Sequence, residues 1–132
     1  MIPMKTLPFV LSILLAASAL AAPKEVPKGS DLRAELFDIA RTTVEHEAGQ
    51  PVKFLGSMTR LGDWAFFNGS IVNSAGKRIL LGPARSADTV VLWKIVDSEW
   101  QMITCAVGIT DVAYASWPEQ YGAPEALLFP EG

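Results

Sequence analysis

Residues Asp88–Val107, with the sequence DTVVLWKIVDSEWQMITCAV, decide the fold of this chain. Two runs rich in Val, Ile, Trp and Thr flank the polar group Asp97-Ser98-Glu99, and this pattern is typical of a β-hairpin. Both faces of the two runs become apolar away from the turn. We therefore expect two strands in the middle of a sheet that is covered on both faces.

The side chains favour one register for this hairpin. It pairs Ile95 with Trp100, Lys94 with Gln101, Trp93 with Met102, and Leu92 with Ile103. A shift by one residue would place Lys94 opposite Met102 and would exchange the two faces of the strand. The first register is therefore the prediction.

Upstream of the hairpin, Ser30–Gly49 predicts a long amphipathic helix. Ser30 or Asp31 is a suitable N-cap, while Gly49 and the following Pro51 end the helix. The apolar stripe recurs at helical spacing: Leu32, Leu36, Ile39, Ala40 and Thr43.

Two further strands are expected at Val52–Thr59 and Trp64–Val72. A three-residue loop, Leu61–Asp63, would place Met58 beside Phe66 and Phe54 beside Ser70. Gly56 and Gly69 predict bulges or close backbone approaches.

The irregular stretch Asn73–Ala87 follows, with a short edge strand expected at Arg78–Leu81. It is the most basic part of the chain after the N-terminal segment, through Lys77, Arg78 and Arg85. A solvated loop and a mobile recognition loop are both compatible with this composition.

The C-terminal part predicts short helices. Thr110 or Asp111 is a suitable N-cap for the first, and Trp117–Tyr121 forms a second turn that ends at Gly122. The complete order of elements predicts an α+β fold, in which an N-terminal long helix packs on a curved four- to five-stranded antiparallel sheet with a short helical C-terminus. This arrangement looks like the cystatin or NTF2-like folds.

The N-terminus has the pattern of a secretory signal peptide. Lys5 precedes the apolar run Leu7–Leu20, and Ala19 and Ala21 form a cleavage signal. The run has about 14 residues, which is short for the roughly 20 of a spanning helix. We expect a signal peptide over 1–21, a flexible leader over 22–29, and a single α+β domain over 30–132, exported to the periplasm or the extracellular space.

Composition limits the possible partners. Removal of Lys5 takes the formal net charge from −3 to −4, and the chain has no dense Lys/Arg cluster. Nucleic acid and stable membrane insertion after cleavage are therefore not expected. Cys105 is the single cysteine, so no intrachain disulfide can form, and its apolar neighbours favour a buried thiol over a reactive one.

The sequence contains no known catalytic fingerprint, and neither a metal nor a cofactor is expected. His46, the only histidine, stands between Glu45 and Glu47 in the last helical turn, where a cation is favourable without any function. A carboxylate such as Asp111 or Asp63 could act as a base only if burial raised its pKa.

The sequence contains three motifs: G-D-W-A-F at Gly62–Phe66, G-x-T-D-V at Gly108–Val112, and W-x3-Y-G-A-P at Trp117–Pro124. With the L-R-A-E-L helix and the G-Q-P-V turn, this set resembles a family of small exported bacterial proteins of unassigned function. The resemblance implies one exported domain and no catalytic residues.

Three functions remain open. The first is a non-catalytic binding module that docks a protein partner, in an inhibitor or immunity-type role. The second is a small-ligand-binding protein or NTF2-like enzyme with a carboxylate base in the concave sheet, and the third is a structural component of an exported assembly. For the first, the candidate binding residues are Asp111, Tyr114, Trp117 and Tyr121. The alternative for these residues is that the aromatics seal the open end of the sheet while Asp111 caps a helix.

Overall fold

A computed structural model describes residues 22–110 and 112–130, and it shows an α+β fold built on a five-stranded antiparallel sheet with the order β1-β2-β3-β4-β5. The elements are β1 (Lys24–Glu25), α2 (Asp31–Ala48), β2 (Lys53–Leu61), β3 (Trp64–Val72), β4 (Asp88–Val96), β5 (Glu99–Val107), η1 (Ala113–Ser116), α3 (Trp117–Tyr121) and α4 (Glu125–Leu128). No helix within these residues has the length and apolar character that crossing a bilayer requires. The expected signal peptide lies outside the described residues.

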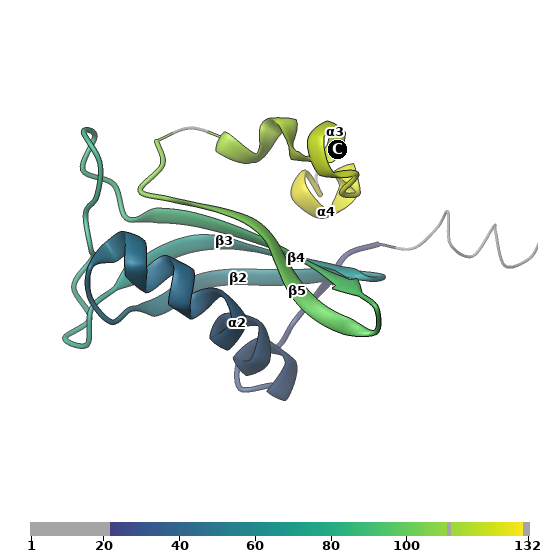
Figure 1. Cartoon of the computed structure of the whole chain (residues 1–132), viewed down its shortest axis with the longest axis horizontal. Helices are drawn as coiled ribbons and strands as arrows, with labels where there is room; N and C mark the ends of the chain where they lie inside the picture. The colour runs from purple at the N-terminus through teal and green to yellow at the C-terminus, as the bar shows by residue number, and fades with distance from the viewer. Residues whose placement is uncertain (1–21, 111, 131–132) are drawn as a thin grey trace, which may run out of the picture.

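The elements form three layers, with the sheet in the middle (Figure 1). Helix α2 covers one face, and η1, α3 and α4 cover part of the other. Side chains between the sheet and α2 form one apolar cluster, and side chains under the C-terminal helices form a second. Because β4 lies between both clusters, its residues 89–93 are buried on both faces.

The long helix α2 has the predicted ends. Ser30 is the N-cap, and its Oγ accepts a hydrogen bond from the N–H of Arg33 at 3.2 Å. Gly49 has the left-handed φ of 72° that ends the helix. Phe37 anchors α2 on the sheet, since its ring stacks on Phe54 with 4.4 Å between ring centres and meets Phe67 edge-on at 5.2 Å.

The helix is not the first element, because β1 precedes it. Residues 22–29 were expected to form a flexible leader, but Lys24 and Glu25 pair with β2 and the N–H of Val26 donates to the carbonyl of Met58 at 2.8 Å. Val26 is buried in the first cluster. A two-residue strand is too short to show periodicity, and burial of one apolar side chain stabilises it.

The hairpin β4–β5 has the predicted turn and three of the four predicted pairs. Asp97 and Ser98 both have positive φ, 53° and 69°, as a two-residue hairpin turn requires. The fourth pair is wrong: a bulge shifts the register beyond Trp93–Met102, so that Leu92 faces Thr104 instead of Ile103. The expected central position holds for β4, whereas β5 is at the edge of the sheet.

The predicted register of β2 and β3 is also wrong, by one residue. The turn contains only Gly62 and Asp63, so Met58 pairs with Phe67 rather than with Phe66. A shift of one residue exchanges the faces of a strand, and Phe67 therefore packs in the first cluster while Phe66 packs in the second. The two expected glycines lie directly opposite each other, Gly56 against Gly69, in a close backbone approach.

The expected edge strand at Arg78–Leu81 does not form between β3 and β4. The segment makes only two isolated bridges, Val72 with Arg78 and Leu81 with Ser86. The Oδ1 atom of Asn73 accepts hydrogen bonds from two backbone N–H groups of the preceding turn, and Gly82 begins another turn. The segment between these two turns is too short to form a regular ladder of hydrogen bonds with a neighbouring strand.

Candidate recognition surface

The C-terminal aromatic residues were the first candidate site, and the structure assigns Trp117 to packing. Trp117 is 5% exposed in the second cluster and meets the rings of Phe66, Tyr114 and Tyr121 edge-on, with ring centres 6.3–6.4 Å apart. Tyr121 is half-buried beside it. Asp111 lies outside the described residues. Trp117 thus packs with Phe66, Val90 and Leu92 on one face of the sheet, which is a packing role.

Tyr114 is half-buried and connects this layer to the sheet. Its ring lies 5.1 Å from that of Phe66 and stacks on the ring of Phe129 at 5.4 Å. Its hydroxyl accepts a hydrogen bond from Nδ2 of Asn68 on β3 at 3.3 Å. Tyr114 and Phe129 therefore form an aromatic wall that stands on the sheet, and Phe129 is 37% exposed.

Beside this wall, the C-terminal helices leave a strip of the sheet uncovered. Successive side chains of a strand point to opposite faces, so the neighbours of Phe54 and Met58 point away from α2. The ladder places five side chains on this uncovered face, which we call the open strip: Leu55, Ser57, Asn68, Ser70 and Asp88. Four of the five are exposed, and Leu55 is 56% exposed.

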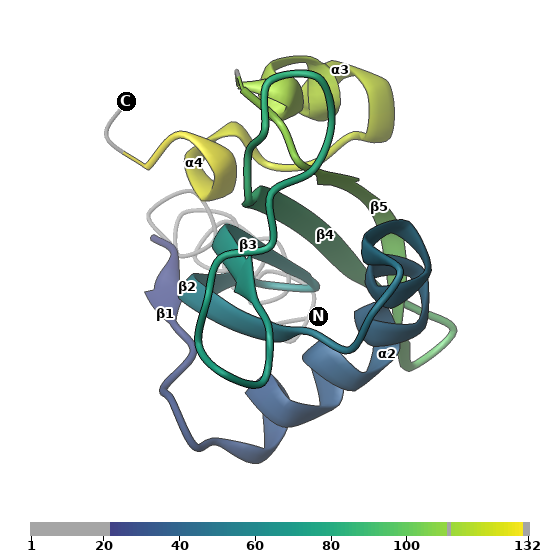
Figure 2. The same ribbon diagram turned by 90° about the vertical axis from the view of Figure 1, so that its left-hand side faces the viewer.

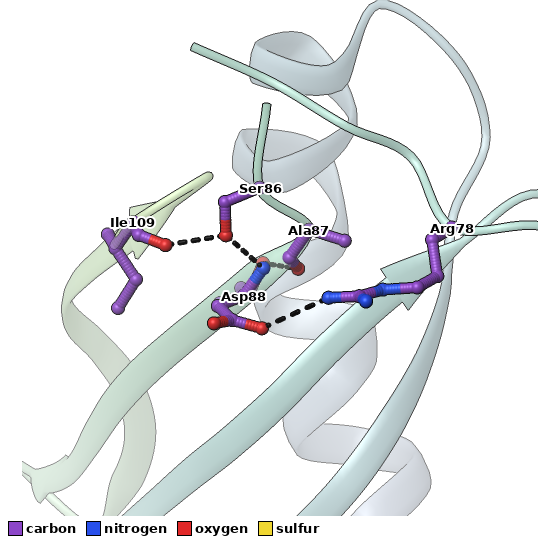
Figure 3. Close-up of polar contacts among 6 residues, drawn as sticks. Arg78, Ser86, Ala87, Asp88 and Ile109 are labelled. Atoms are coloured by element: carbon purple, nitrogen blue, oxygen red, sulfur yellow. Dashed lines mark hydrogen bonds and ion pairs between the residues drawn. The ribbon is translucent and has the colours of Figure 1, made fainter. Parts of the chain in front are cut away.

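The basic loop meets the open strip at Asp88, which Arg78 approaches (Figure 3). Nη2 of Arg78 lies 3.4 Å from Oδ1 of Asp88 in an ion pair that is exposed on both sides. The Oγ of Ser86 donates a hydrogen bond to the carbonyl of Ile109 at 2.5 Å and accepts one from the N–H of Asp88 at 3.0 Å. These bonds fix the loop against the residues that follow β5.

The structure therefore brings together two regions that the sequence treated as separate candidates. In Figure 2 the upper part of the loop between β3 and β4 lies in front of the C-terminal helices, and the bond from Ser86 to Ile109 joins this loop to the segment that precedes them. Pro83 and Ala84 line a shallow hollow together with Ile109, Thr110 and Ala113. Lys77 and Arg85 are exposed on this loop, and Arg85 has a left-handed φ of 55°.

Sequence reasoning did not find the open strip or Phe129. Leu55 is an apolar residue between Phe54 and Gly56, and the sequence does not show which of Phe54 and Leu55 faces the core. The one-residue error in the β2–β3 register hid the alignment of Ser57 with Asn68. The correct turn length would have aligned these residues, but it would not have shown that the C-terminal helices leave them uncovered.

The remaining titratable candidates are scattered. His46 is exposed in the last turn of α2, and Asp63 is exposed in the turn between β2 and β3. The described part of the chain contains no group of three metal-ligating side chains. Cys105 is half-buried, and burial together with the nearby charge of Glu47 raises the pKa of its thiol. Within residues 22–110 and 112–130, the buried polar or charged side chains are Arg33 and Thr89, so Asp63 lacks the burial that a catalytic base would need.

Searches against family models, curated proteins and solved structures found no match to this chain. Its function is therefore argued from the geometry of the candidate surface.

Proposed function

We propose that the chain is an exported, non-catalytic binding module that docks a protein partner on the open strip. The observation that carries this proposal is the position of Leu55. It is the most exposed large apolar side chain in the described residues, and it stands on a sheet face whose other part is covered by a packed layer. Removal of this side chain from water by a partner is favourable in proportion to the apolar area that becomes buried.

The surroundings of Leu55 have the chemistry of a docking surface. Tyr114 and Phe129 supply flat, partly exposed rings that lose little conformational entropy on binding. Arg78 and Asp88 supply charges at the border, where charged residues orient a partner more than they increase affinity. Ser57 and Asn68 offer hydrogen bonds between these two borders.

The alternative of a small-ligand enzyme has less support. A catalytic carboxylate needs burial or a close partner to bring its pKa into a useful range, and Asp63 is exposed in the β2–β3 turn. The proposed resemblance to the cystatin or NTF2-like folds does not decide between the two functions, because those folds host inhibitors, binding modules and enzymes alike. The preference for docking rests on the exposed Leu55 in an open strip that has one charged residue, Asp88.

The test compares two variants with the same chemical change on opposite faces. Leu55→Arg places a charge in the open strip, and Thr42→Arg places the same charge on the exposed side of α2. Each protein is used to capture partners from a periplasmic or extracellular extract. We expect Leu55→Arg to lose the captured protein and Thr42→Arg to retain it, with melting temperatures within a few degrees of the original chain.

Equal capture by Leu55→Arg and the original chain would show that the partner does not contact the open strip. Loss of capture together with early melting would point to misfolding, and Ser57→Arg then provides the second variant. Because Ser57 is exposed and contributes to neither apolar cluster, this substitution should leave folding intact.

One observation favours a structural component of an exported assembly as the second candidate. Strand β5 is nine residues long and lies at the sheet edge, and it carries no charged side chain between Trp100 and Val107. Such an edge can pair with another strand. Light scattering over a range of concentrations tests this, since an assembly role requires a molar mass that rises with concentration and falls for Thr104→Lys.

A further inference from the structure

A cavity of about 420 Å³ lies where β1, the first turn of α2 and the β2–β3 turn meet. Its walls are mainly aliphatic and include Val26, Pro27, Leu32 and Leu61. The volume falls in the usual range of small-molecule sites, about 300–1,000 Å³. No residue of the open strip lines it, so this cavity is separate from the proposed docking surface.

Two cations stand at the rim of the cavity without a negative partner. Lys24 of β1 lies directly opposite Arg60 of β2 in the ladder, and both line the cavity. Directly opposite residues of an antiparallel pair share a face, so these like charges repel each other. Among the described residues, no carboxylate oxygen lies within 4.0 Å of either cation. Glu25 also lines the cavity, and in the ladder it lies opposite Thr59 rather than opposite either cation.

The guanidinium of Arg60 is already oriented. Its Nε donates a hydrogen bond to the carbonyl of Gly62 at 2.9 Å, and its Cζ lies 5.1 Å from the centre of the Trp100 ring. These contacts leave its two terminal nitrogens without a hydrogen bond to described residues. A side chain that is held in place by contacts of this kind loses little entropy when it binds an anion.

The N-terminus of α2 adds to the positive potential. Ser30 and Leu32, at the start of this 18-residue helix, line the cavity. The free N–H groups of a first turn favour a negative charge nearby. Asp31 belongs to the same turn but does not line this cavity.

We propose that this cavity binds an aliphatic carboxylate of the fatty-acid class, with its carboxylate between Lys24 and Arg60 and its chain against Val26, Pro27 and Leu32. An alkyl chain needs no hydrogen bonds inside an aliphatic cavity. A peptide would bury amide groups that this lining cannot satisfy. The anion also removes the repulsion between the two opposed cations.

The test uses protein purified from the exported fraction of expressing cells. Hexanoate, octanoate and decanoate are titrated into it, and calorimetry measures their binding. Each added methylene that enters the cavity should tighten binding about fourfold, which corresponds to about 0.8 kcal/mol per buried methylene. Heptylammonium has the same alkyl chain as octanoate but the opposite charge, and it should not bind. Decanoate below its micelle concentration should also raise the melting temperature.

Two substitutions that each remove one positive charge distinguish binding in the cavity from non-specific electrostatic attraction to the protein surface. Lys24→Gln should weaken decanoate binding about tenfold or more, since it removes one charged contact. Lys28→Gln should leave the affinity unchanged, because Lys28 is exposed and does not line the cavity. Without ligand, Lys24→Gln should melt no earlier than the original chain, because the substitution relieves the repulsion from Arg60.

Three results would each overturn the proposal. The first is an affinity that does not depend on chain length, which indicates an ion on the surface only. The second is an equal loss for Lys24→Gln and Lys28→Gln. The third is a decrease in melting temperature on addition of decanoate, which indicates a detergent effect. Binding of an apolar peptide with a free C-terminal carboxylate, and not of decanoate, would assign the cavity to a peptide instead.

Discussion

Replacement of Trp117 with alanine tests whether the C-terminal helices form a packed second layer. Trp117 is 5% exposed, and it contacts an aromatic ring from β3 and one each from η1 and α3. Loss of a buried tryptophan costs about 3–5 kcal/mol, from lost transfer free energy and the cavity that remains. For a domain of this size, with a typical stability of about 5–15 kcal/mol, this is a large fraction of the free energy of unfolding.

Urea unfolding followed by circular dichroism measures this cost. With a slope of about 2 kcal/mol per molar urea, the midpoint should fall by about 2 M. Phe129→Ala is the matched control, because Phe129 belongs to the same layer but is 37% exposed. It should lose only about 1 kcal/mol.

A loss below about 1 kcal/mol for Trp117→Ala, with an unchanged slope, would refute the packing argument. It would mean that Trp117 is not buried against the sheet in solution. Equal losses for Trp117→Ala and Phe129→Ala would also contradict the difference in burial.

Three further predictions address the close strand approach, the thiol and the N-terminus. Gly69→Ala should cost about 1–3 kcal/mol in urea unfolding, because a Cβ there would overlap the carbonyl oxygen of Leu55 and the Cα of Gly56; unchanged stability would contradict the close approach. The raised pKa of Cys105 keeps its thiol protonated in the folded state, so its contribution to stability is complete at neutral pH and should decrease as the pH rises above about 8.5. Cys105→Ala should lose that pH dependence, and thiol labelling of the folded chain should be slower than in denaturant. Intact-mass measurement of exported protein should give a chain that begins at Ala22, whereas a chain that retains the first 21 residues in a membrane fraction would exclude cleavage.

Local signals allowed the best sequence predictions. Both ends of α2 follow from Ser30 and Gly49, whose cap interactions depend only on residues within one turn. The turn at Asp97 and Ser98 likewise follows from short-range chemistry between two apolar runs. The Gly122 end of α3 was predicted for the same reason.

Non-local packing explains the errors. The bulge beyond Trp93–Met102 has no glycine or proline to mark it, and it allows the apolar side chains of β5 to meet both clusters. Turns of two and three residues were both compatible with Leu61-Gly62-Asp63, and only packing of Phe67 under α2 distinguishes them. The position of β1 depends on pairing with β2 about 35 residues later, which no local pattern can show.

The candidate surface could be predicted only in part. Tyr114 and the Lys77–Arg85 loop were identified from composition, but the bond of Ser86 in this loop to Ile109 after β5 is a non-local contact that composition does not show. Leu55 was missed because its exposure depends on where the C-terminal helices end on the sheet. Such a boundary between covered and uncovered sheet results from the whole fold.

Photo-crosslinking in the producing cell tests the proposed docking surface most directly. A photoreactive amino acid is placed at Ser57 in the open strip, and in a second variant at Thr42 on the opposite layer, both exposed positions. We expect a discrete adduct with one protein from Ser57 and none from Thr42. An adduct from Thr42 and none from Ser57 would contradict it.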